Sequence, residues 1–510
     1  MNVIGKLPFV IATRFSQKYR PPLQQIRNMS LVRSLAFVNN QWVPASSGET
    51  FEVTNPANGQ VLGQVPDMDV DDTEQAVNVA FEAFKTWEHT TAKERSVLLR
   101  KWYNLLEDNK DEIAQIMTAE SGKPLSEAAG EVAYANGFID WFSEEARRIP
   151  GEIVASPTQT KEMMMIRRPI GVAALITPWN FPAAMITRKA GAALAAGCTC
   201  VIKPAEDTPL TALAMADLAA KAGIPKGVIN VVTCSRKKAA EVGRVLCTSP
   251  QVAGLSFTGS TNVGKLLYEQ CASTVKRVSL ELGGNAPFIV FESADLEAAV
   301  KGAIACKFRN CGQTCVSANR LFVQESIFNQ FVAKLEEAVK GLKVGDGAAA
   351  GVTQGPLIND AQATKVKQLV EDAVKKGAKV HLGGKPASEM GARYFQPTII
   401  SDVDHSMRVY NEEIFGPVAV CIPFKSEEEV LAIANSTRSG LAGYFYSNNL
   451  SQIWRVAKRL EVGMVGINEG LLSAPEAAFG GIKESGIGRE GSHYGIEEYS
   501  YIKYLCFGHD

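Results

Sequence analysis

The sequence predicts an α/β protein built on parallel sheets, and three observations carry that prediction. Residues 71–149 keep helical spacing with few breakers. Five short apolar runs then follow, each succeeded by a helical stretch: GVAALIT (171–177), TCVIKPA (199–205), GVINVVT (227–233), GLSFTGS (254–260) and VSLELGG (278–284). A second series of such runs begins after residue 284. Short apolar strands that alternate with helices are typical of βαβ units, whose parallel sheet is buried on both faces.

The two series of strands are separated by a Gly283–Gly284 pair, where we place a domain boundary. The second series contains APFIVF (286–291), NRLFVQ (319–324), AKVHLGG (378–384) and GPVAVCIPF (416–424). A Tyr-rich stretch at 497–507 alternates with strand period, and an exposed terminal strand of this kind needs a partner. The expected organisation is a nucleotide-binding domain (35–147 and 170–283), a second α/β domain (284–483) and a small β element for oligomerisation (148–169 and 484–510).

Composition and charge exclude several classes of protein. Lys and Arg number 53 against 54 Asp and Glu, so the whole chain offers no attraction to nucleic acid or to an anionic membrane. No apolar run reaches the ~18–20 residues that cross a bilayer. Ten cysteines are too sparse for a disulfide scaffold, and no CxxC pair has zinc-ligand spacing. We therefore expect no metal, no nucleic-acid partner and no membrane partner.

The first 34 residues differ from the rest of the chain. No acidic residue precedes Glu49, whereas Lys6, Arg14, Lys18 and Arg20 fall in this basic, Ser-containing segment. Such a composition predicts a mitochondrial transit peptide over 1–34 and a location in the mitochondrial matrix, where thiols stay reduced. The alternative is a basic arm that binds another molecule.

Four segments concentrate chemically unusual residues: TPWNFP (177–182), LELGG (280–284), NCGQTC (310–315) and EEIFGP (412–417). Glu281 ends an apolar strand, at the edge where α/β sheets bind ligands; a carboxylate there is either ion-paired or has a shifted pKa. Cys315 lies in a polar turn that can expose a thiol, whereas Cys247, Cys271 and Cys306 have the surroundings of core residues. No His lies in these segments, which favours a carboxylate over an imidazole as the base, although spacing alone does not exclude a Cys–His pair.

Together these four segments resemble the NAD(P)-dependent aldehyde dehydrogenases, from about residue 36 to the C-terminus. The order of the segments and the 34-residue gap between Glu281 and Cys315 agree with that family. The resemblance implies a Rossmann-type cofactor domain, an α/β catalytic domain and a small β oligomerisation element. It also implies a homo-oligomer, a homotetramer arranged as a dimer of dimers.

The resemblance assigns catalytic roles to three residues. Cys315 would attack the aldehyde carbon as a thiolate and form a thiohemiacetal. The Asn180 side-chain amide and the Cys315 backbone N–H would form the oxyanion hole, where one donor contributes roughly 3–4 kcal/mol in other acyl-transfer enzymes. After hydride transfer leaves a thioester, Glu281 would activate the hydrolytic water.

The same resemblance implies NAD as cofactor. The matching positions are Lys203 and Glu206 for the adenosine ribose, Gly259 and Ser260 for the pyrophosphate, Trp179 for a further phosphate-side contact, Glu413 for the nicotinamide ribose and Phe415 for the nicotinamide. The turn that starts at Gly259 begins like an NTP-binding loop, but Leu266 replaces the Ser or Thr that Mg²⁺ chemistry requires. The Glu206 carboxylate would repel a 2′-phosphate, which favours NAD over NADP.

Substrate choice depends on Arg188, Arg309 and Ser473. Two guanidiniums in one funnel would suit an aldehyde with a carboxylate at its far end; the alternative for each Arg is an ion pair with a nearby acid. With Ser473 in NEGLLSAPEAAFGG, the pair resembles family members that oxidise succinate semialdehyde to succinate in 4-aminobutyrate degradation. Other mitochondrial semialdehydes or medium-chain aldehydes stay open as substrates, as does an inactive structural protein on the same fold.

One position departs from that subgroup, many members of which carry a second cysteine two residues after the nucleophile and form a regulatory disulfide. This chain has Ser317 there, and its nearest thiol is Cys311. A Cys311–Cys315 switch is therefore a hypothesis that requires Cα atoms within about 7 Å.

Overall fold

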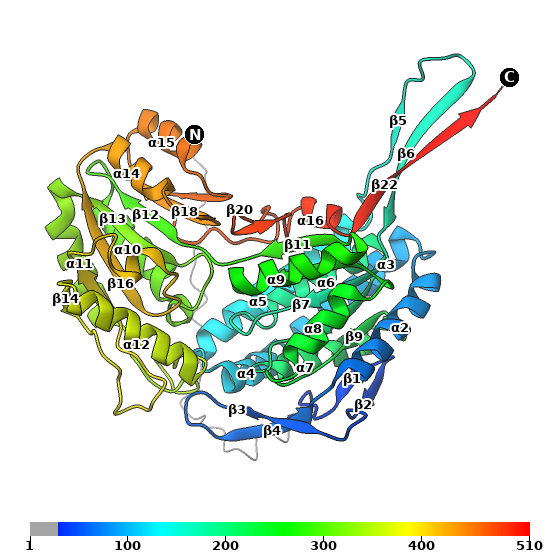
Figure 1. Ribbon diagram of the computed structural model, residues 1–510, viewed down its shortest axis with the longest axis horizontal. Coiled ribbons are helices and arrows are strands. Elements are labelled where there is room, and N and C mark those ends of the chain that lie inside the picture. Colours follow the sequence, from blue (N-terminus) through cyan, green and yellow to red (C-terminus); the bar gives the residue numbers. More distant parts are fainter. Residues whose placement is uncertain (1–28, 510) are drawn as a thin grey trace, which may run out of the picture.

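The computed structural model describes residues 29–509, arranged as two lobes side by side with a β arm that projects from the first lobe (Figure 1). Most of the predicted transit peptide, 1–34, lies outside the described residues. Its last part packs on the first lobe: the Leu31 side chain is buried, its N–H donates to Glu112 at 2.7 Å, and Arg33 pairs with Asp217 at 2.5 Å.

The first lobe is built on an eight-stranded sheet. Its strands lie in the order β2 (Gln41–Val43), β1 (Ala36–Val38), β9 (Ile229–Val231), β8 (Thr199–Lys203), β7 (Val172–Ile176), β10 (Val252–Thr258), β11 (Arg277–Glu281) and β21 (Gly486–Ile487). The strands from β9 to β11 are parallel, and they are the five strands that the first series of apolar runs predicted. Nearly all their residues are buried, as helices on both faces require.

The helices of the first lobe cover both faces of that sheet. They are α2 (Val70–Trp87), α3 (Ala92–Asp108), α4 (Lys110–Ser121), α5 (Leu125–Glu145), α6 (Ala184–Ala196), α7 (Pro209–Lys221), α8 (Ala239–Thr248), α9 (Thr261–Cys271), the short η1 (Ala272–Thr274) and α16 (Tyr494–Glu497). Local sequence sets their ends: Asp69 and Thr91 form capping boxes at α2 and α3. Helix α4 ends at Gly122 with φ 75°, and Pro124 prevents its continuation, so Lys123 lies in a tight turn before α5.

The second lobe contains a seven-stranded sheet. Its order is β14 (Lys379–Leu382), β15 (Thr398–Ser401), β16 (Val418–Phe424), β13 (Ala318–Gln324), β12 (Ala286–Val290), β18 (Ala442–Tyr446) and β19 (Met464–Ile467), with β14 alone antiparallel. Its helices are α10 (Leu296–Phe308), η2 (Arg309–Gly312), η3 (Glu325–Ile327), α11 (Phe328–Lys340), α12 (Asp360–Lys375), α13 (Arg408–Asn411), α14 (Glu427–Asn435) and α15 (Leu450–Arg459). Two apolar cores lie on its two faces, so the α/β fold class with parallel sheets is confirmed for both lobes.

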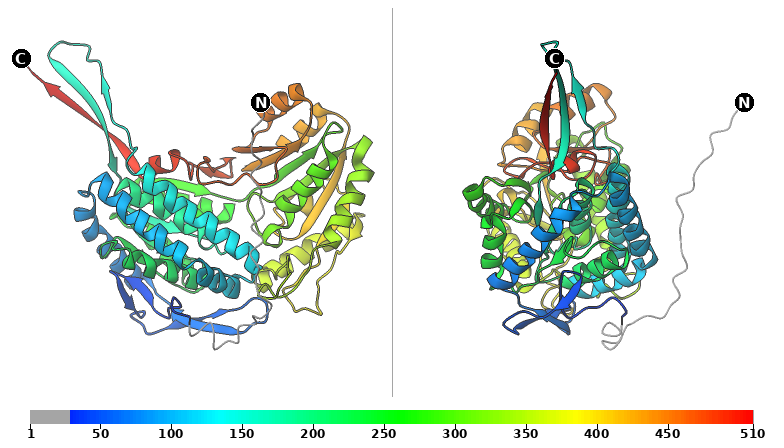
Figure 2. Two further views of the ribbon diagram at one scale, coloured as in Figure 1. Left: turned by 180° about the vertical axis from the view of Figure 1, so that it is seen from behind. Right: turned by 90° about the vertical axis from the view of Figure 1, so that its right-hand side faces the viewer.

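The arm is a three-stranded antiparallel sheet of β5 (Glu152–Val154), β6 (Lys161–Pro169) and β22 (Ser500–Gly508) that stands clear of both lobes (Figure 2). Ile502, Tyr504 and Phe507 on β22 are exposed, in keeping with the predicted oligomerisation role. Residues 484–499 of the predicted oligomerisation element lie against the first lobe instead, where β21 pairs with β11.

The described residues also contain two short strand pairs: β3 (Thr50–Thr54) with β4 (Val61–Pro66), and β17 (Ser439–Gly440) with β20 (Ile482–Lys483). Within residues 29–509, no helix is long and apolar enough to cross a membrane.

Candidate active site

The predicted site residues lie where the two lobes meet. Lys203 ends β8, Asn180 follows β7, Ser260 follows β10 and Glu281 ends β11, so the carboxyl ends of four adjacent strands contribute. From the second lobe, segments that precede β13 and β16 bring Cys315 and the Glu413–Phe415 pair. A cavity of about 370 Å³ is lined from both lobes, and its lining includes Trp179, Asn180, Gly259, Ser260, Glu281, Cys315, Glu413 and Phe415.

Cys315 is the half-buried thiol of a strained loop. The loop begins with Asn310, Cys311 and Gly312 in the left-handed region, with φ values of 50°, 56° and 73°. A Cβ on Gly312 would lie 2.1 Å from the Gly416 carbonyl oxygen, so the loop requires glycine there. Burial raises the pKa of Cys315 to about 12, with Arg188 opposing that rise. Cys315 is thus a thiol at neutral pH and needs a base to become nucleophilic.

Glu281 is the carboxylic acid in the same cavity. Its side chain is buried, and neither carboxyl oxygen has a hydrogen-bond partner among residues 29–509. Burial and the nearby Glu490 raise the pKa of Glu281 well above its usual value, although Arg188 and Lys189 oppose the shift. An unsatisfied carboxyl group in a cavity can accept a hydrogen bond from water and take its proton, as a general base does.

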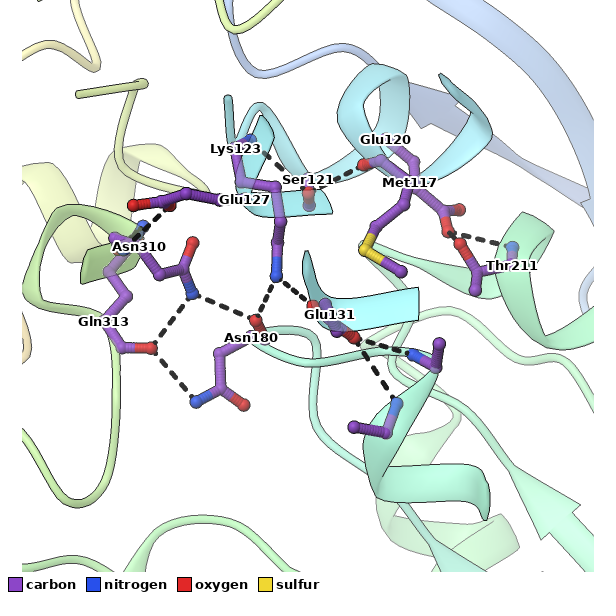
Figure 3. A network of polar contacts seen from close by, with 12 residues as sticks. Met117, Glu120, Ser121, Lys123, Glu127, Glu131, Asn180, Thr211, Asn310 and Gln313 are labelled. Atoms are coloured by element: carbon purple, nitrogen blue, oxygen red, sulfur yellow. Dashed lines mark hydrogen bonds and ion pairs between the residues drawn. The ribbon is translucent and has the colours of Figure 1, made fainter. Parts of the chain in front are cut away.

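Asn180 is held by polar contacts to its backbone as well as its side chain (Figure 3). Its Nδ2 donates to the Gln313 carbonyl oxygen at 3.0 Å, which leaves the second N–H of the amide for a ligand. Its own carbonyl oxygen accepts from Lys123 Nζ at 2.7 Å and from Asn310 Nδ2 at 2.9 Å. These bonds connect the Asn180 loop of the first lobe to the Cys315 loop of the second.

The cofactor side of the cavity fits a dinucleotide. Ser260 caps the 11-residue helix α9, whose N-terminal N–H groups favour an anion. A Cβ at Gly259 would lie 2.4 Å from the Phe257 ring, and one at Gly283 would lie 2.8 Å from Glu413 Oε2, so a side chain at either position would force the Phe257 ring or the Glu413 carboxylate to move. Glu413 accepts from the Gly284 N–H at 3.1 Å, and burial raises its pKa to about 7.

Aromatic rings close one side of this region. Phe415 has a φ of 55°, and its ring meets Trp179 edge-on with centroids 5.5 Å apart. A flat heterocycle packs well against such a pair. The Gly259–Ser260 turn, the Glu413 carboxylate and the two aromatic rings thus line one continuous cavity with Cys315.

Lys203 and Glu206 follow β8 at the same edge of the sheet but do not line this cavity. Lys203 is buried and donates to the Pro204 carbonyl oxygen at 3.2 Å. Arg236, which the sequence analysis missed, does line the cavity, and it makes no ion pair with any residue of the described range. The sequence signal that could have identified Arg236 is its position as a basic residue soon after β9, at the carboxyl edge of the sheet.

The three substrate candidates have different surroundings. Arg309 and Ser473 line a second cavity, of about 250 Å³, with Tyr134 and Phe181. Arg309 lies over the Phe181 ring at 5.2 Å and has no ion-pair partner within residues 29–509. Arg188 lines neither cavity: its Nε pairs with Glu490 at 2.5 Å, which is the alternative that its sequence context left open.

Arg188 nevertheless keeps donors without a hydrogen-bond partner. Its guanidinium is fully buried, 4.0 Å from the Phe479 ring centroid, and neither Nη2 nor the ion-paired Nε makes a hydrogen bond with a described residue. Glu490 also pairs with Lys189. No local sequence pattern singles out Glu490, because it lies in a C-terminal segment about 300 positions from both cations.

The two cysteines of the hypothetical redox switch belong to different cores. Cys311 is buried with Leu357 and Val366 on one face of the second sheet, whereas Cys315 packs against the core that contains Cys306. Both are free thiols. Burial strongly raises the pKa of Cys311, which disfavours its thiolate. The switch stays a hypothesis that this packing does not support.

Comparisons with known proteins agree with this geometry. Residues 42–505 match the model of the aldehyde dehydrogenase family. The chain is 57% identical over 480 residues to the mitochondrial succinate-semialdehyde dehydrogenase of Homo sapiens, covering 94% of this chain and 89% of that one. It is 54% identical to a glutarate-semialdehyde dehydrogenase of Pseudomonas aeruginosa, covering 95% and 99%. The crystal structure of an NADP-dependent enzyme of Escherichia coli superimposes with a TM-score of 0.93, at 54% identity, over 94% and 99% of the two chains.

Proposed function

This chain belongs to the aldehyde dehydrogenase family, and from that premise we propose that it oxidises succinate semialdehyde to succinate with NAD in the mitochondrial matrix. The family match confirms the predicted resemblance to the aldehyde dehydrogenases. The protein is therefore an aldehyde-oxidising enzyme that uses a nicotinamide cofactor. The observation that carries the proposal is one cavity lined by Cys315, Glu281 and Asn180 together with a phosphate-binding turn.

Catalysis starts with the thiol of Cys315. Because its pKa is raised to about 12, it must pass its proton to a base as the sulfur attacks the aldehyde carbon; the Glu281 carboxylate in the same cavity can accept that proton, and Arg188 stabilises the thiolate. The oxygen of the thiohemiacetal then receives hydrogen bonds from the free N–H of Asn180 and from the Cys315 backbone N–H. Two aimed donors of this kind stabilise a tetrahedral oxyanion, each by roughly 3–4 kcal/mol.

A bound nicotinamide cofactor would supply the acceptor for the hydride of this adduct. Ser260 and the α9 N-terminus would hold its pyrophosphate, Trp179 would make a further phosphate-side contact, Glu413 would bind the nicotinamide-side ribose, and Phe415 would pack near the nicotinamide. The Cys315 thioester that remains is hydrolysed by a water that Glu281 deprotonates. The raised pKa makes Glu281 a stronger base than an ordinary carboxylate, which favours this proton transfer.

The second cavity supports an acidic substrate. Arg309 makes no ion pair with a described residue, although Glu127 in the same 250 Å³ cavity interacts with it electrostatically, and Ser473 offers a hydroxyl there. Arg188 lines neither cavity, so Arg309 and Ser473 are the groups that would bind the substrate. A short aldehyde that bears a carboxylate would satisfy these groups, whereas an uncharged aldehyde would leave them unpaired.

A longer dicarboxylic semialdehyde is a second candidate, because the Pseudomonas aeruginosa relative is named for glutarate semialdehyde.

NAD is favoured by Glu206, which would accept hydrogen bonds from ribose hydroxyls and repel a 2′-phosphate. Arg236 on the cavity wall works against complete exclusion of NADP. The basic N-terminal segment supports matrix import, and the exposed apolar face of the arm supports a dimer of dimers.

We expect succinate semialdehyde to be the best substrate in a panel with glutarate semialdehyde and hexanal, assayed with NAD and with NADP by absorbance of the reduced cofactor. In Arg309→Gln, loss of a charge-assisted hydrogen bond should raise KM for succinate semialdehyde about 10- to 100-fold.

The matched control for this variant is hexanal, whose KM should change less than about threefold because it has no carboxylate for Arg309 to bind. An equal rise for both aldehydes would assign Arg309 to the fold, and preference of the parent enzyme for hexanal would refute the proposed substrate.

A further inference from the structure

Three charged residues at a spacing of four lie at the start of α5. They are Lys123, just before the helix, and Glu127 and Glu131 in its first two turns. Residues four apart lie on one side of a helix. All three contact the two loops that carry the oxyanion donors, and the sequence analysis assigned no role to any of them.

Lys123 and Glu131 hold the Asn180 segment (Figure 3). Lys123 Nζ donates to the Asn180 carbonyl oxygen at 2.7 Å and forms an ion pair with Glu131, with both side chains only 1% exposed. The other oxygen of Glu131 accepts from the backbone N–H of Ala183 at 3.0 Å, at the start of α6. The backbone is therefore held both at Asn180 and three residues beyond it.

Glu127 holds the second loop. Its Oε2 accepts from the Asn310 N–H at 2.9 Å, where the backbone enters its left-handed turn. The Asn310 side chain then donates to the Asn180 carbonyl oxygen at 2.9 Å and to the Gln313 carbonyl oxygen at 3.2 Å. Since Gln313 also accepts from the Asn180 amide, the loops of the two lobes are bonded to each other near Cys315.

A buried ion pair is a poor way to gain stability, because desolvation of the two charges offsets much of their attraction. A pair whose members also bond the backbone of an oxyanion donor has a different use: it fixes that donor. Preorganised donors are effective in catalysis because they need no reorientation when negative charge develops. Misplacement by about 1 Å can cost about 100-fold in rate.

We propose that Lys123, Glu127 and Glu131 are positioning residues that set the geometry of the oxyanion hole across the two lobes. They act through Asn180 and the Cys315 loop; all three also line the second cavity, beside Arg309 and Ser473, and none of them lines the cavity of Cys315. This inference rests on the proposed role of Asn180 in aldehyde oxidation.

The test is a double-mutant cycle on kcat. Lys123→Met/Glu131→Gln removes both charges together and keeps an amide oxygen for the Ala183 N–H. We expect kcat to fall about 10- to 100-fold in the otherwise native enzyme, with NAD affinity and KM within about threefold. In the Asn180→Ala background the same pair of changes should cost less than about threefold, because the donor that they position is gone.

Equal fold losses in both backgrounds would overturn the proposal, since they would assign the ion pair to the fold alone. Glu127 provides a second arm: Glu127→Ala should lower kcat, whereas Glu127→Gln should restore it, because an amide oxygen can still accept from Asn310. Loss of activity in both Glu127 variants despite a native unfolding temperature would also contradict the proposal.

Glu120→Gln is the matched control. Glu120 is buried nearby, but its carboxylate accepts from the Leu210 and Thr211 N–H groups at 2.7 and 2.9 Å, at the start of α7. This change should lower the unfolding temperature and leave kcat of the folded enzyme unchanged.

The cycle uses any aldehyde that the parent enzyme oxidises. Absence of all aldehyde oxidation would therefore refute the proposed function, while equal losses in an active parent would refute only the positioning role.

Discussion

The residues behind two walls of the catalytic cavity differ in how their polar groups are paired. Behind the Asn180 wall, the carboxylates of Glu127 and Glu131 and the ammonium of Lys123, which line the second cavity, all have hydrogen-bond or ion-pair partners. At the Glu281 wall, both Glu281 oxygens, and outside the cavity the Nη2 of Arg188, are buried without a hydrogen-bond partner among residues 29–509.

This difference separates residues that hold atoms in place from residues that take part in the reaction. Buried polar groups are normally paired, because an unpaired one costs roughly 1–3 kcal/mol. The paired wall can therefore hold atoms in place, whereas the unpaired wall keeps groups ready to exchange protons or to bind a ligand. The pKa values of Glu281 and Cys315 are strongly raised on the unpaired side, as expected for groups that change protonation during turnover; on the paired side, burial raises the pKa of Glu127 to about 7, against the effect of Lys123.

The largest effect should come from the reactive thiol itself. Cys315→Ser preserves shape but replaces sulfur by a hydroxyl that the site cannot readily ionise. We expect aldehyde oxidation to fall at least about 10⁴-fold, as happens when a catalytic nucleophile is removed elsewhere. Cofactor binding, followed by fluorescence titration, should stay unchanged. Turnover close to that of the parent enzyme would end the covalent mechanism.

The next effect tests the unpaired carboxyl group. Burial raises the pKa of Glu281, so its deprotonated form increases only as the pH rises, and kcat should climb with pH in the parent enzyme. Glu281→Gln should lower kcat by about 10²- to 10⁴-fold and abolish that climb. Rapid mixing should still show a burst of reduced cofactor, because the acyl enzyme forms but is not hydrolysed. A Gln variant that retains the parent's pH profile would assign the base elsewhere.

The smallest effect concerns the cation next to the thiol. Arg188 lowers the pKa of Cys315 against the larger effect of burial, so Arg188→Met should raise that pKa. At pH 8 the rate of iodoacetamide alkylation at Cys315 should then fall about tenfold, the change that corresponds to one pKa unit. Arg309→Met is the control, since Arg309 contributes less to Cys315 and should slow alkylation less. Equal rates in Arg188→Met and the parent would confine Arg188 to its ion pair with Glu490.

The fold was largely predictable because its evidence is local. The five parallel strands of the first lobe and the helices between 70 and 145 follow from apolar runs and helical spacing. Short strands such as β15 and β19 were missed, since four residues carry little periodic signal.

The candidate site was predictable only in part. Glu281 stands out because it ends an apolar strand, and Cys315 because it lies in a polar turn, whereas the role of Asn180 came from the family resemblance. By contrast, Arg188 was expected in the substrate funnel, but its pairing with Glu490 depends on a segment about 300 positions away. Arg236, Lys123, Glu127 and Glu131 were missed for the same reason. Spacing along the chain does not show which loops meet in space.

By itself the sequence determined two lobes of parallel strands, the position of a reactive thiol and its carboxylate, and a turn suited to phosphate, because each is encoded within a few neighbouring residues. Only the tertiary structure decided which charges are paired. The field at a buried group depends on atoms within a few ångströms of it, and in this chain those atoms come from both lobes and from the C-terminal turn.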